Sequence, residues 1–433
     1  MGEPALRRGR LLGRALTIGW LFALQTLLWL GGSLWLRLRF GGRERRNEWF
    51  AHNMLALFRA LGATFVKVGQ IMSTRPDLLP KHVTKALERL QDDVGPFPFR
   101  EVRRTLEADL GRPPEQLFAE LAPVPVASAS VSQVHKARLH DGRIVAVKVR
   151  RPAVHEICAF DLAVMQWAAR QAARWPGIGA VDPEGAVVQF GQAVFAQLDF
   201  RLEAANNRRF RANFKGDPDV AFPEVIEALS SERVLCMSFV EGTKILSVGE
   251  TRFDPHRVAR VGLQALLKMI FVDGFVHADL HPGNILVTPQ GKVALLDVGL
   301  VGELDEPHRK AFMRFFGAWA QRDGDAMARI MFDLSTERPS QPEAFEAYRA
   351  AIIEFVGRYW GQRLGQVQVG RVLMDLLSIV RQHRIRLNPS FTTVNIAIAV
   401  TEGIGKQLDP DLDVMSEALP FFMSHPLDVA DQG

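Results

Sequence analysis

Residues 276–287 read VHADLHPGNILV and residues 293–301 read VALLDVGLV; these two neighbouring stretches carry the strongest signal in the chain. Asn284 follows Asp279 by five positions, and Asp297 follows Asp279 by eighteen, within Leu-Leu-Asp-Val-Gly. Phosphoryl transfer needs a carboxylate near the nucleophile and oxygen ligands that hold Mg²⁺ against nucleotide phosphates. Asp279, Asn284 and Asp297 supply that chemistry, so the two stretches predict a phosphoryl-transfer site. A solvated loop without function is the alternative, and the combined spacing disfavours it.

A lysine upstream completes the pattern. Residues 135–149, HKARLHDGRIVAVKV, read as two strands joined by the turn-forming Asp141-Gly142. Lys148 lies in the second strand, and Val145-Ala146-Val147-Lys148 matches the strand lysine that binds nucleotide phosphates in kinases. Such a lysine pairs with a helix carboxylate, and Glu203 in FRLEAANN is the best candidate. Alone, Lys148 would more often be a merely exposed strand residue.

The segment before this strand differs from a kinase nucleotide loop. In place of G-x-G-x-x-G, the sequence has small residues that permit a close backbone approach to phosphates but lack the freedom of glycine. These residues are Ala127, Ser128, Ala129, Ser130, Val131, Ser132, Gln133 and Val134. We expect them to form the phosphate loop; a turn that only packs tightly is the alternative.

Apolar periodicity divides the rest of the chain. Residues 48–121 follow a helical pattern, residues 161–214 follow another that is interrupted at WPGIGAVDPEG, and residues 232–240 look like a strand. After about residue 255, helices dominate apart from short strands near 285–287 and 293–296. The chain is therefore predicted to be α+β. Its expected domains are an N-terminal segment (1–47), a helical extension (48–122), a smaller lobe (123–242) and a helical lobe (243–433).

Charge separates the N-terminal segment from the remainder. The 433-residue chain carries +5, but residues 1–46 hold nine Arg and two Glu, a net +7, so the remainder carries −2. This distribution indicates a basic appendage on a near-neutral body and favours a membrane lipid surface over nucleic acid as the partner. The chain has only two cysteines, Cys158 and Cys236, which excludes a disulfide framework or a thiolate metal cluster and favours a reducing compartment.

Residues 17–36, TIGWLFALQTLLWLGGSLWL, contain no formal charge and would form a helix about 30 Å long. Four of the eight tryptophans lie within the first 49 residues, as is typical at a membrane interface. The pattern favours a membrane-seeking helix, although Gln25, Gly31, Gly32 and Ser33 leave a buried core helix open. A cleaved signal peptide is disfavoured, since no small-residue cleavage site follows. Basic flanks on both sides leave spanning and lying in the interface equally open.

These motifs resemble the UbiB/AarF (ADCK-type) family of atypical protein-kinase-like proteins over residues 48–410, including Lys67-Val68-Gly69-Gln70, a family hallmark. The resemblance implies a bilobal protein-kinase-like fold, with a helical extension over the active site and MgATP as the nucleotide. It also implies ATPase or phosphotransferase activity in the biosynthesis of ubiquinone or a related isoprenoid quinone. Isoprenoid quinone precursors and quinone-biosynthesis enzymes would then be the partners.

By resemblance, each motif takes a role. Residues 127–134 resemble the nucleotide loop, Lys148 and Glu203 the strand–helix ion pair, and Asp279 the catalytic aspartate. Asn284 and Asp297 resemble the Mg²⁺ ligands, while Lys67 and Gln70 belong to the extension motif. Met237, Ser238, Phe239 and Val240 resemble the hinge whose backbone faces adenine, and His277 is expected to brace the catalytic loop.

Two departures from the family pattern qualify the resemblance. Relatives carry Glu-x-Asp where this chain has Gln197-Leu198-Asp199, so Lys67 is expected to contact Asp199 or the nucleotide instead. Many bacterial relatives also continue into a C-terminal membrane hairpin, and here the N-terminal apolar run is expected to serve as the anchor.

The leading hypothesis is a membrane-associated, Mg²⁺-dependent atypical kinase or ATPase that faces the cytoplasm at a bacterial-type inner membrane. One alternative is a small-molecule phosphotransferase of the aminoglycoside or choline kinase type, which would not be expected to carry the motif at 67–70. The other is a nucleotide-gated scaffold that binds lipids or partners and turns over ATP only incidentally.

Overall fold

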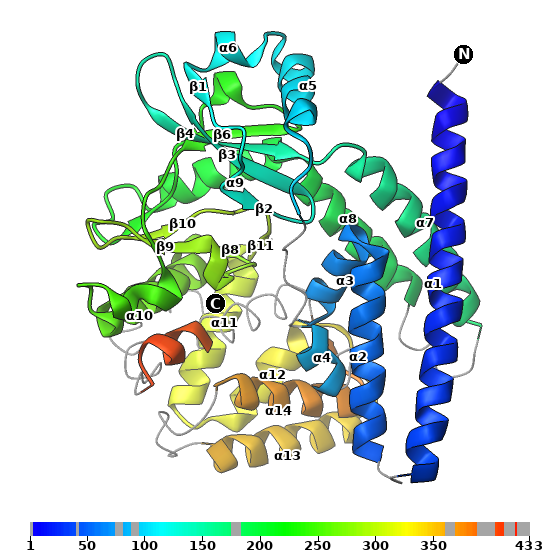
Figure 1. Ribbon diagram of the computed structural model, residues 1–433. Helices are drawn as coiled ribbons and strands as arrows, with labels where there is room; N and C mark the ends of the chain where they lie inside the picture. Colours follow the sequence, from blue (N-terminus) through cyan, green and yellow to red (C-terminus); the bar gives the residue numbers. More distant parts are fainter. Residues whose placement is uncertain are drawn as a thin grey trace. The chain divides into compact units, whose positions relative to one another are not determined.

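The computed structural model describes residues 3–39, 43–73, 81–87, 95–174, 183–359, 369–387, 403–410 and 421. The chain forms two compact units (Figure 1). Unit 1 comprises Met1–Leu202 and Val225–Phe239, and unit 2 comprises Glu203–Glu224 and Val240–Gly433. The chain therefore passes between the units three times, and each unit is described separately below.

Unit 1 contains a group of helices and one antiparallel sheet. Its helices are α1 (Glu3–Arg39), α2 (Arg43–Leu61), α3 (Ala63–Ser73), α4 (Lys81–Leu87), α5 (Phe99–Leu110), α6 (Pro114–Leu117), α7 (Val154–Ala172) and α8 (Pro183–Leu198). The strands are β1 (Glu120–Leu121), β2 (Ala127–Ser128), β3 (Ser132–Arg138), β4 (Ile144–Arg150) and β6 (Val234–Ser238). Their order is β1-β3-β4-β6, with β2 also paired to β3.

The β3–β4 hairpin follows from the alternating pattern and its turn. Gly142 has φ +90°, which a residue with a side chain rarely adopts, and Asp141 Oδ1 accepts a hydrogen bond from the Arg143 N–H at 3.0 Å. Alternate residues of β4 then take opposite faces of the sheet. Val145, Val147 and Val149 join a core with residues of α5 and α6. Lys148 consequently belongs to the other face.

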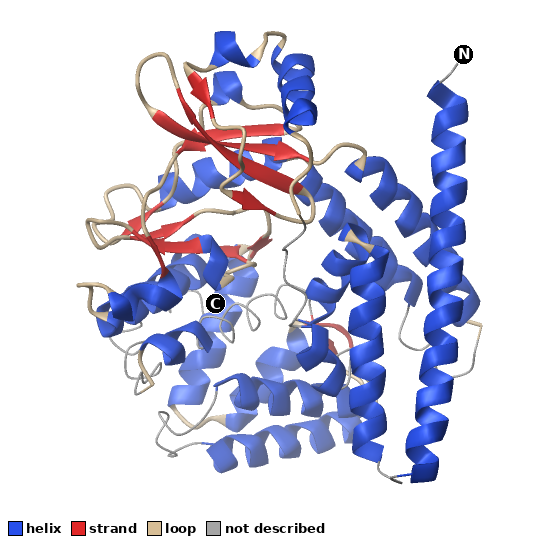
Figure 2. Cartoon of the chain, in the orientation of Figure 1, coloured by secondary structure: helices blue, strands red, loops and turns tan. Residues whose placement is uncertain are grey.

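Unit 2 is mainly helical around short strands (Figure 2). Its helices are α9 (Phe200–Asn213, whose first turn belongs to unit 1), α10 (Pro255–Leu267), α11 (Glu306–Ala320), α12 (Gly324–Asp333), α13 (Pro342–Tyr359) and α14 (Val369–Gln382). The strands are β5 (Val220–Ala221), β7 (Thr243–Lys244), β8 (Phe275–His277), β9 (Ile285–Val287), β10 (Val293–Leu295), β11 (Val301–Glu303), β12 (Ser335–Glu337) and β13 (Arg386–Leu387). They form sheets β5-β10-β9-β7, β8-β11 and β12-β13.

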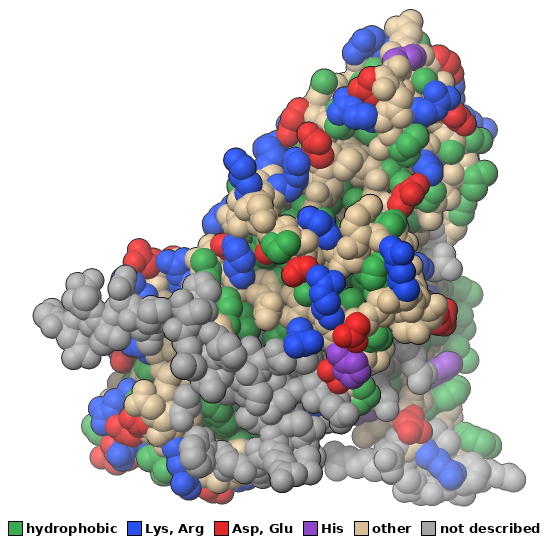
Figure 3. Space-filling view, turned by 90° about the vertical axis from the view of Figure 1, so that its left-hand side faces the viewer, with side chains coloured by type: hydrophobic (Ala, Val, Ile, Leu, Met, Phe, Trp, Pro, Cys, Tyr) green, Lys and Arg blue, Asp and Glu red, His purple; other side chains and the backbone are tan. Residues whose placement is uncertain are grey.

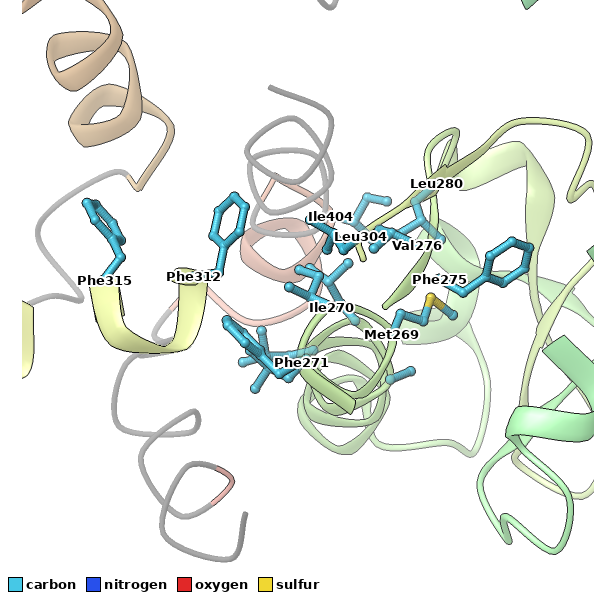
Figure 4. Close-up of a cluster of buried hydrophobic side chains, with 14 of the residues drawn as sticks. Met269, Ile270, Phe271, Phe275, Val276, Leu280, Leu304, Phe312, Phe315 and Ile404 are labelled. Carbon is cyan, nitrogen blue, oxygen red and sulfur yellow. The ribbon is translucent and has the colours of Figure 1, made fainter. Parts of the chain in front are cut away.

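The core of unit 2 supports the segments that contain and flank residues 276–301. After α10, a π-helical turn at Lys268–Asp273 ends at Gly274, whose φ is +60°. A Cβ at position 274 would lie 2.5 Å from the Leu304 carbonyl oxygen, so only glycine fits there. The cluster drawn in Figure 4 includes Phe275 and Val276 of β8 and Leu280, which directly follows Asp279. The predicted catalytic loop is thus anchored by apolar packing on both sides of Asp279.

Most predicted elements are present, with differences at their ends. The strands expected at 135–149, 232–240, 285–287 and 293–296 are confirmed as β3, β4, β6, β9 and β10. The helix expected to begin at Asp161 instead begins at Val154. Its cap residue, Ala153, has φ +58° and no side-chain capping bond, so the usual start signal is missing. Strands such as β8 and β11 were not predicted because three residues are too few to show a period.

Charged side chains of both signs are interspersed over the described part of the face in Figure 3. This mixture agrees with the charge of −2 that remains after the +7 of residues 1–46 is set aside. The basic character of the chain therefore remains a property of its N-terminal segment.

Candidate functional site

Hydrogen bonds link the segments of unit 2 that carry the three predicted oxygen donors, Asp279, Asn284 and Asp297. Asp279 follows β8, Asn284 ends the short 3₁₀ turn before β9, and Asp297 lies just beyond β10. The Asn284 side-chain Nδ2 donates to the Asp279 carbonyl at 3.4 Å, and the Leu296 N–H donates to the Asn284 carbonyl at 3.0 Å. Because β9 and β10 pair Ile285 with Leu295, the strand ends bring Asn284 beside the segment that carries Asp297. The structure therefore brings these residues into one region.

Glu203 of α9 joins the same region. A Cβ on Gly299 would lie 3.2 Å from Asp297 Oδ1 and 3.5 Å from Glu203 Oε2, so both carboxylates approach the bare backbone of this glycine. The Gly299 N–H donates to Asp297 Oδ1 at 3.1 Å and orients that carboxylate. Asn206, one turn after Glu203, donates from Nδ2 to the Val298 carbonyl at 3.0 Å. The sequence analysis missed Asn206, although its i+3 spacing from Glu203 within FRLEAANN was a visible signal.

His277 is a fully buried imidazole between the two aspartates. Its Nδ1 accepts a hydrogen bond from the Asp279 N–H at 3.1 Å, which fixes the direction of the catalytic loop. Burial lowers the pKa of His277, and the nearby carboxylates of Asp279 and Asp297 only partly oppose this effect. Its Nε2 has no hydrogen-bond partner among the described residues. This geometry suits a neutral brace better than a proton-transfer group.

Lys148 occupies the centre of the unit 1 sheet. It lies opposite Val134 of β3 and Leu235 of β6, and it is only 7% exposed. Its Nζ lies 5.2 Å from the centre of the Phe200 ring, at the start of α9. Glu203 is three residues further along the same helix, on the side shared by i and i+3 positions. The predicted ion pair of Lys148 with Glu203 stays a prediction.

The predicted nucleotide loop is a tight turn between β2 and β3. Ala127 pairs with Val134 and Ser128 with Gln133, while the Ala129 N–H donates to the Ser132 carbonyl at 2.8 Å. Ser130, Ser132 and Gln133 are each at most 2% exposed, so short polar side chains fill the space beneath the turn. Binding of phosphate by this turn remains a prediction.

Arg151 holds the turn from one side. Its guanidinium donates to the Ala129 carbonyl at 3.1 Å, to Ser128 Oγ at 3.0 Å and to the Gly95 carbonyl at 2.7 Å. Burial lowers the pKa of Arg151 without removing its charge. This role of Arg151 was not predicted, because the basic pair Arg150-Arg151 at the end of the strand gives no indication of a long-range partner.

Gln133 links the turn to the helical extension. Its Oε1 accepts from the Phe97 N–H at 3.0 Å, and its Nε2 lies 2.8 Å from Nε2 of His135. The Nδ1 of His135 lies 2.8 Å from the Ala122 carbonyl, which fixes Nδ1 as the protonated nitrogen and Nε2 as the acceptor. Burial lowers the pKa of His135 and favours this neutral form.

The predicted hinge straddles the boundary of the two units. Met237 and Ser238 pair with Ala146 and Val145 of β4, and the chain enters unit 2 between Phe239 and Val240. Beyond it, a Cβ on Gly242 would lie 2.7 Å from the Val287 carbonyl oxygen, which explains the glycine after the hinge. Contact of these four residues with adenine stays a prediction.

The extension motif lies on α3. Lys67 is half-buried there, whereas the Gln70 side chain lies outside the described part of the structure. Asp199 accepts hydrogen bonds from Arg201 at 2.9 and 2.7 Å, and these bonds lower the pKa of its carboxyl group. In the described structure the Asp199 carboxylate is paired with Arg201, and the expected contact of Lys67 with Asp199 stays a prediction. Contact of Lys67 with nucleotide, the other expectation, stays a prediction.

The donor set of unit 2 fits one particular kind of metal site. Among the described residues, no group of three or more His, Cys, Asp or Glu side chains could hold a metal ion. Asn284 and Asp297 supply a neutral and an anionic oxygen. Mg²⁺ commonly binds through one or two protein oxygens together with water and substrate phosphates. These residues therefore fit a Mg²⁺ ion that nucleotide phosphates help to hold.

The fold and these motifs define a protein with a kinase-like domain. The model of the ABC1 atypical kinase-like domain matches residues 89–331, and the model of the UbiB helical domain matches residues 352–413. The chain belongs to the ABC1 atypical kinase-like family. The predicted UbiB/AarF relationship and kinase-like fold class are thereby confirmed.

Two similar proteins extend this finding. The uncharacterized protein sll1770 of Synechocystis sp. is 31% identical over 418 residues, which cover 93% of this chain and 70% of that protein. A structure of the Rv3197–erythromycin complex from Mycobacterium tuberculosis has a TM-score of 0.57 at 24% identity, covering 81% of this chain and 90% of that one. This second likeness supports the fold alone.

Proposed function

We propose that the protein is a membrane-associated atypical kinase or ATPase that uses MgATP and supports the biosynthesis of ubiquinone or a related isoprenoid quinone. The observation that carries the proposal is the unit 2 framework, on which Asp279, Asn284 and Asp297 share a hydrogen-bonded scaffold. The Glu203 carboxylate and the Gly299 turn beside Asp297 support the same assignment. A solvated loop without function would require no buried brace such as His277.

Each residue has a role in the proposed mechanism. Lys148 and the backbone of residues 127–134 bind the nucleotide phosphates, and the backbone of residues 237–240 holds adenine. Asn284 and Asp297 would hold Mg²⁺, and this ion would neutralise charge on the phosphates. Asp279 orients an attacking water or acceptor hydroxyl and takes its proton. His277 fixes the Asp279 backbone, so that this carboxylate is positioned before substrate arrives.

The quinone-lipid role is the finer part of the proposal. It is supported by family membership and by Gly13–Ser33, a segment long and apolar enough to cross a membrane by length and composition alone. We place the kinase-like body on the cytoplasmic side of a bacterial-type inner membrane. There it would act on, or beside, isoprenoid quinone precursors and the enzymes that process them.

Two assays test the proposal. Purified full-length protein should bind ATP in a Mg²⁺-dependent way and hydrolyse it with lipid vesicles present; absence of both would overturn the enzymatic function. Quinone profiling of a deletion strain complemented with wild type, Lys148→Ala or Asp279→Asn tests the biological role. We expect only wild type to restore quinone. Full rescue by a turnover-dead Asp279→Asn protein would favour the nucleotide-gated scaffold, and stoichiometric phosphorylation of a soluble alcohol would favour a small-molecule phosphotransferase.

A further inference from the structure

One side of α1 is fixed along the polar helix α2. Ile18 is 4% exposed in a cluster with Leu57 and Leu61 of α2, and the Gln25 Nε2 donates to the Asn53 carbonyl at 2.7 Å and to Asn53 Oδ1 at 2.9 Å. Further along, a Cβ on Gly32 would collide with the indole of Trp49. From Ile18 to Gly32 these contacts extend over about 21 Å of helix. The two helices run side by side in Figure 1.

An ion pair fixes the same side of α1 to α7. Arg14 donates to both carboxylate oxygens of Asp161, from Nε at 2.9 Å and from Nη2 at 2.7 Å, and also to the Leu61 carbonyl at 2.6 Å. The Asp161 side chain is completely buried. Leaving such a carboxylate unpaired is costly, so the docked position of α1 is part of the fold of unit 1.

The opposite side of α1 is apolar and exposed. At 100° per residue, Leu16, Trp20, Leu27 and Leu30 lie on the side facing away from Ile18 and Gln25. Their exposed fractions are 68%, 63%, 68% and 52%. A contiguous apolar surface of this kind marks an interaction site.

The docked geometry is incompatible with a membrane crossing. If residues 17–36 spanned the hydrocarbon core, α2 would enter it alongside, because Gln25 at the middle of the run is bonded to Asn53. Glu48, His52 and Arg59 of α2 are exposed and would then face lipid. Charged side chains in that position are strongly disfavoured.

We infer that α1 lies in the plane of an anionic lipid bilayer, docked on α2, with its outer apolar face buried in the interfacial region. This inference rests on the membrane association proposed above and deepens it. Arginines occupy both ends of the segment and give residues 1–46 a net charge of +7, of which the charge on Arg14 is balanced by Asp161. That distribution is unhelpful for orienting a spanning helix but well suited to anionic headgroups along a helix that lies flat. Trp20, on the exposed face, suits the same depth.

Topology provides the first test. Full-length Gly13→Cys and Glu48→Cys proteins would be added to sealed vesicles of phosphatidylglycerol and phosphatidylcholine and treated outside with a membrane-impermeant thiol reagent. The native Cys158 and Cys236 are buried, which keeps their background low. We expect both introduced thiols to react, because both stay on the side of the kinase-like body. Reaction at only one of the two positions would show a crossing and overturn the inference.

Vesicle binding provides the second test. Leu27→Glu should weaken binding to phosphatidylglycerol-containing vesicles at least tenfold, whereas Val188→Glu, at an exposed apolar position of α8, should change it less than twofold. Equal effects of the two substitutions, or wild-type binding that does not depend on phosphatidylglycerol, would overturn the inference. So would a dimer that Leu27→Glu disrupts when no vesicle binding occurs. ATP turnover in the same samples reports on the proposed enzymatic function separately, because Leu27 lies outside the nucleotide site.

Discussion

The predicted catalytic segment of unit 2 (276–301) and the α1–α2 hairpin of unit 1 are built in opposite ways. In the catalytic segment, short-range bonds position the functional groups: the Asp279 N–H donates to His277, and the Gly299 N–H donates to Asp297. In the hairpin, partners far apart in sequence determine the geometry, such as Arg14 with Asp161. A local motif specifies its own shape, whereas an apolar helix takes its placement from a few distant contacts.

This difference separates two kinds of failure. A substitution in the catalytic segment should remove chemistry while the fold persists, because its apolar supports come from the core of unit 2. A substitution at a hairpin contact should detach α1 from unit 1 while ATP turnover persists. Measurements of turnover and of stability on the same variants can therefore distinguish the two kinds of failure.

The largest effect is expected for Asp297→Asn. Loss of the anionic Mg²⁺ ligand should reduce ATP turnover about 10³-fold, which corresponds to about 4 kcal/mol of transition-state stabilisation. The thermal midpoint should change little, since the amide retains an oxygen that can accept from Gly299. Asp333→Asn, an exposed carboxylate of the same unit, is the control and should retain turnover. A loss of folding that accompanies the loss of turnover would contradict the proposed independence of chemistry and fold.

The second largest effect is expected for Arg14→Met, which keeps most of the side-chain volume but removes the charge. The buried Asp161 loses its partner, which should disfavour the docked state by about 3 kcal/mol. Hydrogen exchange should accelerate along α1, while turnover per folded molecule changes less than twofold.

Two comparisons control the Arg14 experiment. Arg103→Met removes one member of the exposed pair with Glu115 and should leave exchange along α1 unchanged. The double variant Arg14→Met/Asp161→Leu should recover part of the lost protection, because no unpaired carboxylate remains buried. Unaltered exchange in Arg14→Met would show that α1 is held by other contacts.

A smaller effect distinguishes two adjacent glycines. A Cβ on Gly31 meets nothing within 4 Å, whereas one on Gly32 would lie 2.7 Å from Cζ2 of Trp49. Gly31→Ala should stabilise α1 by up to about 1 kcal/mol through helix propensity. Gly32→Ala should be about 2 kcal/mol less stable than Gly31→Ala, because the indole must move. Denaturant unfolding followed by tryptophan fluorescence measures both; equal stabilities would rule out the close approach of α1 and α2.

The sequence was sufficient to predict those parts of the structure that depend on residues close together in the chain. The spacing of Asp279, Asn284 and Asp297 predicted their shared region, and the alternation around Lys148 predicted the β3–β4 hairpin. The position of α1 could not be predicted from the sequence. Gln25 and Gly32 looked like dilution of an apolar run, but they are the contact positions toward α2, and only the distant residues Asn53 and Trp49 explain them.

The same limit applies to parts of the site itself. Arg151 holds the nucleotide turn through carbonyl oxygens of Ala129 and Gly95, and carbonyl partners leave no trace in a sequence. Asp199 is bonded to Arg201, two residues away, so Lys67 would have to compete for that carboxylate. Side-chain competition of this kind depends on backbone direction, which periodicity does not supply.

The smallest effect concerns pH and the long-range network beneath the nucleotide turn. Burial lowers the pKa of His135 in the fold, whereas in the unfolded chain it returns to about 6.5. The neutral ring contributes stability that is fully present above pH 6.5 and is lost as pH falls through the lowered folded pKa, because the unfolded chain then binds an extra proton.

Thermal unfolding from pH 7.5 to 5.5 should therefore show a downward shift in wild type that is smaller in His135→Gln. An amide can still donate to the Ala122 carbonyl and accept from Gln133, but it does not titrate in this range. His140→Gln, at an exposed position just beyond β3, is the matched control and should keep the wild-type pH dependence. Identical pH profiles for wild type and His135→Gln would show that protonation of His135 does not change the stability of the fold. The geometry of the network below the predicted nucleotide turn would then depend on short-range contacts, as in the catalytic segment, and not on long-range contacts, as in the hairpin.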